Sequence, residues 1–218
     1  MRNLIVFVFF FLAYQVTAHR DSLKSLYATN TYLEKIAILN QTKTDFIKWK
    51  RDIKIFIHPT NHQNIENTEA TFSADFSELK KELAIIIDEL NQIIEPISFS
   101  FVNKIEESNL EILIGSSNDS RKLDPSTRFL IQKNWAIQHC LVSGDGTEIV
   151  KSFIFLDLYR IPNLRIKKRL LRKKIVQSIG MFNETDDFKE SIFYEGLSEH
   201  VNFSSMDLEL IRLFYHSN

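Results

Sequence analysis

The stretch from Asn163 to Gly196, NLRIKKRLLRKKIVQSIGMFNETDDFKESIFYEG, decides how this chain folds. It starts as a strongly basic segment with helical periodicity and stops at Gly180. It then continues as an acidic loop that leads into the short run Ser191-Ile192-Phe193. The apolar positions of the helical segment indicate what the rest of the chain packs against it.

The predicted helix has two apolar sides. Steps of four and seven residues return to the same helix face, and they define one stripe formed by Leu164, Leu171, Ile175, Ile179 and Phe182. Ile166 and Leu170 lie on another side, close to Lys173 and Gln177. A helix with two apolar sides is usually packed between layers. We expect the stripe to meet a β-sheet and the other side to meet the segment that follows in sequence.

The length and composition allow one substantial core, because the chain has 218 residues of which 44% are hydrophobic. Residues 1–18 have the features of a secretory signal peptide. They carry an early arginine, an apolar run too short to span a bilayer comfortably, and small residues before a cleavage point after Ala18. A retained membrane anchor is the alternative. The first interpretation predicts a secreted or periplasmic mature protein without a transmembrane segment.

The remaining chain is predicted to form a helical segment over residues 19–48 and a single α+β domain over residues 49–218. Hydrophobic alternation indicates strands at residues 53–57, 98–102, 110–114, 136–142 and 149–158. Periodicity indicates helices at residues 22–39, at 75–94 with Ser73 as N-cap, at 162–180 opened by Pro162, and at 206–215 capped by Ser204 or Ser205. We therefore expect a mixed β-sheet of about five strands with packed helices, followed by a short C-terminal helical subdomain.

The charge is unevenly distributed, although the formal net charge is only −1. Eight basic residues lie between Arg160 and Lys174. We expect a basic surface, able to bind an anionic surface or polymer, that is formed by Arg160, Arg165, Lys167, Lys168, Arg169 and Arg172. The alternative is a solvated helix face that pairs with the downstream acids Asp186, Asp187 and Glu190. A nucleic-acid partner is not expected, because the chain has no aromatic-basic platform.

Cysteine and histidine offer few candidates for chemistry. Cys140 is the only cysteine, so no internal disulfide can form. We expect its thiol to be a small buried group, with a catalytic nucleophile as the alternative. Four histidines do not have the spacing of a metal-ligand set, namely His58, His62, His139 and His200. No metal and no cofactor are expected.

Three segments resemble a family of exported bacterial proteins known as domain of unknown function 2927. They are residues 32–37 with Lys48-Trp49 and residues 53–56, then Gln177-x-x-Gly180-x-x-Asn183 with Ser191-Ile192-Phe193, and last Asp207 with residues 211–215. Together these segments run in order through most of the mature chain. The family usually has two glutamates at the positions of Lys173 and Lys174, and an aspartate at the position of Glu184. The resemblance therefore does not imply an activity that uses paired acids.

The same region is similar, at the level of the fold, to zinc peptidases of the metzincin type. Those enzymes place H-E-x-x-H-x-x-G-x-x-H/D on the helix that follows the sheet. Their chemistry requires two neutral imidazoles one helical turn apart, a glutamate that activates the bound water, and a glycine before a third ligand. This register is occupied by Lys173, Lys174, Gln177, Gly180 and Asn183. A protonated lysine has no lone pair, so the resemblance implies a zincin-like scaffold that has lost its metal site.

The candidate site is a vestigial cleft formed by these five residues. Gln177 and Asn183 either line a cleft that binds a ligand or make structural hydrogen bonds, and the satisfaction of buried amides favours the second. Lys173 could act as a nucleophile if its neighbours lowered its pKa. We expect Lys173, Gln177 and Asn183 to converge. The sequence predicts an exported, non-catalytic binding or structural protein; the alternative is a peptidase-like hydrolase that uses an unrecognised site.

Overall fold

The computed structural model describes residues 33, 36–37, 46–59, 69–117, 119, 131, 133–196 and 198–216. The predicted signal peptide and most of the predicted first helix lie outside the described residues. The described elements are β1 (Ile53–Ile57), α2 (Glu69–Ile93), β2 (Phe99–Phe101), the 3-10 helix η1 (Ile105–Glu107), β3 (Leu110–Gly115), β4 (Ala136–Val142), β5 (Ile149–Asp157), α4 (Leu164–Ser178) and α5 (Ser205–His216). No helix in this part of the chain is both long and apolar enough to cross a membrane.

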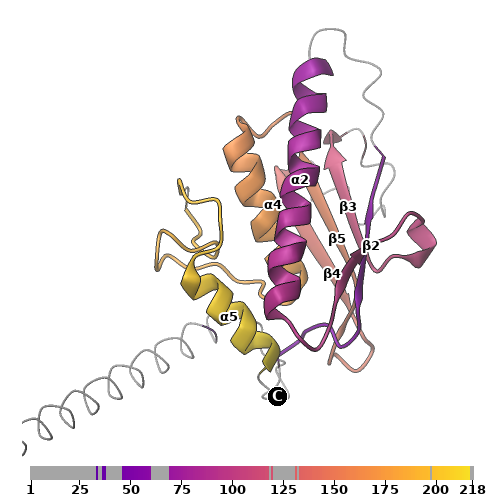
Figure 1. The fold of residues 1–218 in the computed structure, drawn as a ribbon, viewed down its shortest axis with the longest axis vertical. Coiled ribbons are helices and arrows are strands. Elements are labelled where there is room, and N and C mark those ends of the chain that lie inside the picture. The colour runs from indigo at the N-terminus through magenta and orange to yellow at the C-terminus, as the bar shows by residue number, and fades with distance from the viewer. Residues whose placement is uncertain are drawn as a thin grey trace, which may run out of the picture.

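Five strands form one mixed sheet in the order β2-β1-β3-β5-β4. Neighbouring strands are parallel except at one edge, where β4 pairs antiparallel with β5. Figure 1 shows α2 and α4 side by side on one face of this sheet, with α5 near their lower ends. The predicted α+β fold with a mixed sheet of about five strands is confirmed.

The main core lies between the sheet and the helices. Strand side chains alternate between the two faces of a sheet, and alternate positions of the central strands are buried toward α2 and α4. The residues of this core include Ile55, Ile112, Ile154, Leu156, Leu83, Ile86, Leu171, Ile175 and Ile179. Leu33 and Ile36 belong to the same cluster, so part of the predicted segment 19–48 packs on the domain. A smaller cluster holds Leu113, Ile137 and Phe155, which occupy the opposite phase of the strands, together with Ile131.

The helix ends correct two of the sequence predictions. Ser73 is not an N-cap, because α2 begins at Glu69 and passes through it. The additional turn carries Phe72, whose ring lies 4.0 Å from the ring of Tyr159, and this tertiary contact outweighs the local capping signal. The basic helix is capped by Asn163 rather than opened by Pro162, since the Asn163 side chain accepts a hydrogen bond from the Ile166 amide.

Helix α5 begins with a reciprocal cap. The Ser204 hydroxyl accepts a hydrogen bond from the Asp207 amide at 3.1 Å, and the Asp207 carboxylate accepts one from the Ser204 amide at 2.8 Å. This arrangement satisfies two amides at the helix start. Of the two predicted capping residues, Ser204 is therefore the one that caps the helix.

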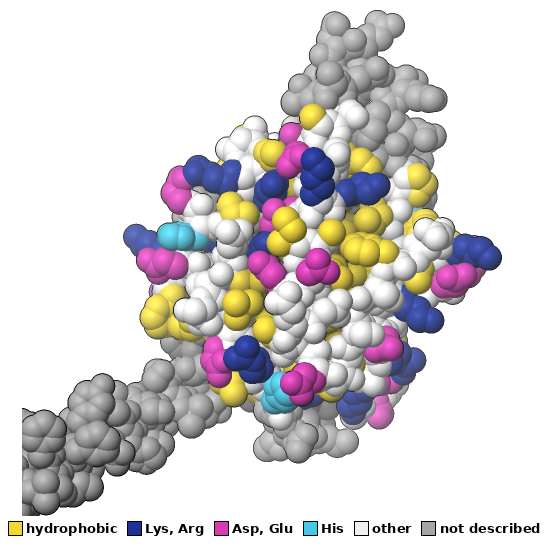
Figure 2. Space-filling view, in the orientation of Figure 1, with side chains coloured by type: hydrophobic (Ala, Val, Ile, Leu, Met, Phe, Trp, Pro, Cys, Tyr) yellow, Lys and Arg dark blue, Asp and Glu magenta, His cyan; other side chains and the backbone are white. Residues whose placement is uncertain are grey.

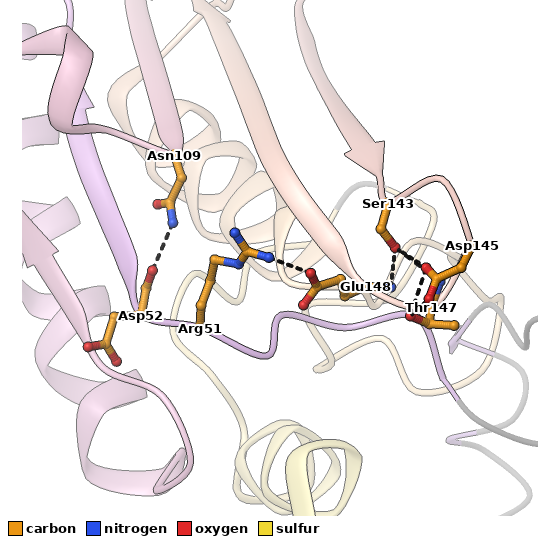
Figure 3. Close-up of polar contacts among 7 residues, drawn as sticks. All are labelled: Arg51, Asp52, Asn109, Ser143, Asp145, Thr147 and Glu148. Carbon is orange, nitrogen blue, oxygen red and sulfur yellow. Dashed lines mark hydrogen bonds and ion pairs between the residues drawn. The ribbon is translucent and has the colours of Figure 1, made fainter.

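Asp145 holds the turn between β4 and β5. Its carboxylate accepts hydrogen bonds from the Ser143 hydroxyl at 2.6 Å and from the Thr147 hydroxyl at 2.9 Å (Figure 3). These bonds, that of Ser143 first, lower the pKa of Asp145 to about 2. The neighbouring Glu148 forms an ion pair with Arg51. The hairpin is thereby tied to the segment that precedes β1.

Candidate functional site

Helix α4 turns Lys173, Lys174 and Gln177 toward the segment that follows it. The Lys173 ammonium lies 2.6 Å from the Glu184 carboxylate and donates to the Tyr194 carbonyl at 2.9 Å. The Gln177 amide donates to the other Glu184 oxygen at 3.1 Å and accepts from the Lys174 ammonium at 2.7 Å. These side chains therefore form one connected polar network, which we call the Lys173 network.

Lys173 and Gln177 meet at Glu184, the residue next to Asn183. The backbone N–H of Asn183 donates to the Ile36 carbonyl at 3.0 Å, and the residue is exposed. Gln177 also donates to the Phe182 carbonyl at 3.1 Å, so its amide group is satisfied within the protein. Sequence reasoning missed Glu184, although its place beside the predicted site residue in an acidic loop was a usable signal.

Gly180 permits the turn that brings this loop back to α4. Its φ of 116° is a conformation that side chains other than glycine rarely adopt. A Cβ at this position would lie 2.5 Å from the Ile47 carbonyl oxygen and 2.8 Å from the Phe214 ring. Both the backbone and the packing therefore require glycine.

The three segments of the family resemblance meet at the end of α4. The Trp49 indole donates to the Ser178 carbonyl at 2.9 Å, and the Tyr215 hydroxyl donates to the Ile179 carbonyl at 2.9 Å. Carbonyls in the last turn of a helix lack partners within the helix, so these side chains complete it. Trp49 and Tyr215 thus have structural roles.

Ser191-Ile192-Phe193 is fixed by Asp207, which is fully buried. The Asp207 carboxylate accepts hydrogen bonds from the Ser191 hydroxyl at 2.6 Å and from the Ile192 amide at 3.1 Å. Arg169 donates from the other side to the Ser191 carbonyl at 3.1 Å and to the His200 carbonyl at 2.7 Å. The run therefore holds the C-terminal segment against α4.

Burial controls the electrostatics of the Lys173 network. Desolvation lowers the pKa of Lys173, and the Glu184 carboxylate opposes this shift without cancelling it. Desolvation also lowers the pKa of Lys174. A lowered pKa is one requirement of a lysine nucleophile. The Lys173 ammonium, however, donates to Glu184 and Tyr194, as a structural ion pair does.

The Lys173 network does not fit the zinc ion that the zincin resemblance implies. Zinc needs neutral imidazole, thiolate or carboxylate ligands, whereas Lys173 is a hydrogen-bond donor and Gln177 directs its NH₂ group toward Glu184. Across the described residues, no group of three or more His, Cys, Asp and Glu side chains could hold a metal ion. His62 lies outside them. No step of a metal-dependent reaction can be assigned to these side chains.

The predicted basic surface is wrong for Lys167, Arg169 and Arg172, which are only 4%, 6% and 0% exposed. Acids of α2 neutralise much of the basic run, in the pairs Lys167–Asp75 at 2.5 Å, Lys168–Glu78 at 3.6 Å, Lys168–Glu82 at 3.5 Å, Arg172–Glu82 at 2.6 Å and Arg172–Glu89. Arg165 and Arg160 pair with Glu199 and Asp157. The steps of three, four and seven residues between the acids place them on one side of α2, a signal that was present in the sequence.

Cys140 contacts the end of α4, since its sulfur lies 3.5 Å from the Ser178 carbonyl oxygen. Its sulfur accepts a hydrogen bond from the Gln138 amide at 2.7 Å and lies 3.2 Å from the Ser152 hydroxyl. Burial raises the pKa of the Cys140 thiol to about 12. The thiol is therefore protonated at neutral pH, although Cys140 is only partly buried and not the fully buried group that the sequence predicts.

A second polar cluster, not predicted from the sequence, crosses three parallel strands. His58 follows β1, and its Nε2 lies 2.9 Å from the Glu111 carboxylate of β3. The Lys151 ammonium of β5 lies 2.6 Å from the other Glu111 oxygen. His58 is buried, and its contact, followed by that of Lys151, lowers the pKa of Glu111. A charged residue within the otherwise apolar run 110–114 was the signal that could have indicated this cluster.

A cavity of about 670 Å³ lies beside His58. Its walls come from the end of β1, from α2 and from the end of β2, and they comprise Ile55, Phe56, Ile57, His58, Pro59, Phe76, Lys80, Ala84, Phe101, Val102 and Asn103. Figure 2 shows hydrophobic side chains gathered beside α2 on this face of the molecule. The cavity is thus apolar for the most part, with a histidine, a lysine and an asparagine as its polar groups.

Comparison with known proteins supplies a family and a remote structural likeness. The family model described as a protein of unknown function, DUF2927, matches residues 30–218. A crystal structure of myroilysin is similar with a TM-score of 0.43 and 8% identity, over 85% of this chain and 93% of that one. Another myroilysin structure gives 0.45 and 10%, over 78% and 83%. No curated protein sequence matches.

Proposed function

This chain belongs to the DUF2927 family, and on that premise we propose that it is an exported, non-catalytic binding protein on a zincin-like scaffold. Export rests on the sequence of residues 1–18, and N-terminal sequencing of the secreted protein should begin at His19. A mature protein that retains the apolar run 4–13 would contradict export.

The observation that carries the non-catalytic part of the proposal is the Lys173 network. On a zincin-like scaffold, the helix after the sheet would carry the metal ligands. In this chain the corresponding positions of α4 carry Lys173, whose ammonium pairs with Glu184, and Gln177, whose side-chain amide donates a hydrogen bond to Glu184. Their hydrogen-bonding capacity serves to attach the C-terminal segment to α4.

Metal analysis of the purified mature protein tests this proposal. We expect less than stoichiometric zinc after dialysis, and no cleavage of unfolded casein with or without added zinc. The Lys173→Met variant should behave in the same way in both assays. Stoichiometric zinc, or casein cleavage that Lys173→Met abolishes, would overturn the proposal.

A second candidate function is a hydrolase that uses His58 as a general base. It is favoured by the contact between His58 and Glu111, because a carboxylate that orients a buried imidazole next to a cavity is a common feature of general-base sites. Hydrolysis of p-nitrophenyl esters by the protein tests it, with His58→Gln as the inactivating variant. His139→Gln, at an exposed histidine of β4, is the matched control. Equal rates in the two variants would exclude this candidate.

A further inference from the structure

The cavity beside His58 exists because β2 is shorter than its neighbour. The ladder between β1 and β2 ends where the Val102 amide donates to the Ile55 carbonyl at 2.9 Å. On its other side, β1 continues to pair with β3 through Ile57, and the His58 amide then donates to the Ile112 carbonyl at 2.9 Å. Among the described residues, no strand therefore pairs with β1 beyond Ile55 on the β2 side, and the cavity lies there between β1, α2 and the end of β2.

The walls of this space are suited to an apolar molecule. On α2, Phe76, Lys80 and Ala84 are spaced four residues apart, so they lie along one side of the helix. Ile57 and Phe101 provide the opposite wall, and Phe101 is 46% exposed. A volume of about 670 Å³ is typical of a small-molecule site.

The charges of the lining residues indicate which polar group a bound ligand should carry. Among the described residues that line the cavity, Lys80 is the only lysine or arginine, and none is acidic. Its ammonium lies 5.7 Å from the centre of the Phe76 ring, and no carboxylate of the described residues forms an ion pair with it. The acid that binds His58 is Glu111, which is not part of the lining. The cavity thus presents cationic and neutral donor groups beside an apolar wall.

We propose that this cavity binds an aliphatic carboxylate, with its chain between Phe76 and Phe101 and its carboxylate at Lys80. The inference names the ligand class of the proposed binding function and rests on it. An ammonium and a carboxylate attract each other more strongly at an apolar wall than in bulk water, since the local dielectric constant is lower. The chain removes apolar surface of the cavity from water.

Isothermal titration with dodecanoate, below its micelle concentration, tests the site. Ala84 is an exposed residue of α2 that lines the cavity, so the Ala84→Trp side chain should fill it. We expect this variant to bind dodecanoate about tenfold more weakly, or weaker still. Ile85→Trp is the control, because Ile85 is the next residue on α2, is exposed, and does not line the cavity. Thermal unfolding establishes that both variants fold.

Lys80 is tested separately with a neutral ligand of the same length. Lys80→Gln should weaken dodecanoate by about tenfold and leave dodecanol unchanged, because only the carboxylate loses an ion pair. Lys81→Gln is the control, since Lys81 pairs with Glu78 and lies outside the cavity. Dodecanoate binding that Ala84→Trp does not weaken, or equal binding of dodecanol and dodecanoate, would overturn the inference. Neither result changes the expected outcome of the zinc and casein assays, so those assays test the non-catalytic proposal separately from this inference.

Discussion

The Lys173 ammonium lies 2.6 Å from the Glu184 carboxylate, but the Lys173 side chain is 8% exposed and that of Glu184 is 33% exposed. The two partners are therefore not equivalent. Glu184→Ala leaves a buried, unpaired ammonium and should lower the free energy of unfolding by about 2–4 kcal/mol. Lys173→Met leaves a carboxylate that water can reach, and should cost about half as much. Urea denaturation measures both free energies of unfolding.

Glu190→Ala is the control, at an exposed acid of the same loop, and should change the free energy of unfolding by less than about 0.5 kcal/mol. Equal costs at Lys173 and Glu184 would contradict this account.

Ile175→Ala should destabilise the protein strongly, because Ile175 is completely buried in the core between α4 and the sheet. Removing these atoms loses burial and leaves a cavity, at a cost of about 2–5 kcal/mol in the free energy of unfolding. Ile85→Ala is the matched control on α2, where the isoleucine is 50% exposed. A loss below about 0.5 kcal/mol at Ile175 would mean that the phase of α4 is wrong.

The geometry at Glu184 predicts how zinc binding could be engineered. The triple variant Lys173→His/Lys174→Gln/Gln177→His places two imidazoles one turn apart, facing the carboxylate that Lys173 and Gln177 contact. We expect this variant to bind zinc in calorimetric titration. Adding Glu184→Ala should abolish the binding, while adding Asn183→Ala should leave it intact. The reverse pattern would identify Asn183 as the third ligand position.

Acid should weaken the contribution of Glu111 to stability. Its contacts with His58 and Lys151 hold its pKa below the ordinary value of 4.5, so the folded state favours the ionised carboxylate. This contribution is fully present above the ordinary pKa and is lost as the pH falls through the lower pKa of the folded state. The difference in the free energy of unfolding between wild type and Glu111→Gln should therefore shrink from about pH 5 to about pH 3. The corresponding difference for Glu106→Gln, at an exposed acid of η1, should stay small throughout.

Cys140 should react slowly with thiol reagents while the protein is folded. With a pKa raised to about 12, only about one thiol in ten thousand is ionised at pH 8. The unfolded chain provides the control, because the ordinary pKa of 9.0 leaves about one in ten ionised. Iodoacetamide labelling followed by mass spectrometry should be about a thousandfold faster in urea. Similar rates in both states would show that the thiol is accessible and ionised in the fold.

The strands could be predicted closely because their pattern is local. The apolar run 110–114 is bounded by polar residues, and the observed strand Leu110–Gly115 differs from it by one residue. The face of α4 that carries Ile175 and the face that carries Lys173 follow from helical periodicity alone. Helix starts were less predictable, as α2 shows, because a tertiary contact of Phe72 extends it past the residue with the best capping side chain.

The sequence indicates which charged residues are unusual, but the pairs that they form could not be predicted, because these depend on how elements distant in sequence are placed. Lys167 and Asp75 are 92 residues apart, and His58 and Glu111 are 53 residues apart. The first pair requires the crossing of α2 and α4, and the second requires the register of β1 against β3. The cavity beside His58 was equally hidden, since it depends on where β2 ends relative to β1.

The buried Arg172 constrains how this chain can vary. Its guanidinium is completely buried between Glu82 and Glu89 of α2. A neutral residue at 172 leaves Glu89 without this cation and Glu82 with Lys168 alone, and a neutral residue at 82 leaves a buried cation with one acid fewer. A well-packed apolar set at all three positions would remove the conflict altogether. Substitutions at positions 82, 89 and 172 should therefore occur together, so that the facing residues of α2 and α4 change jointly in related proteins.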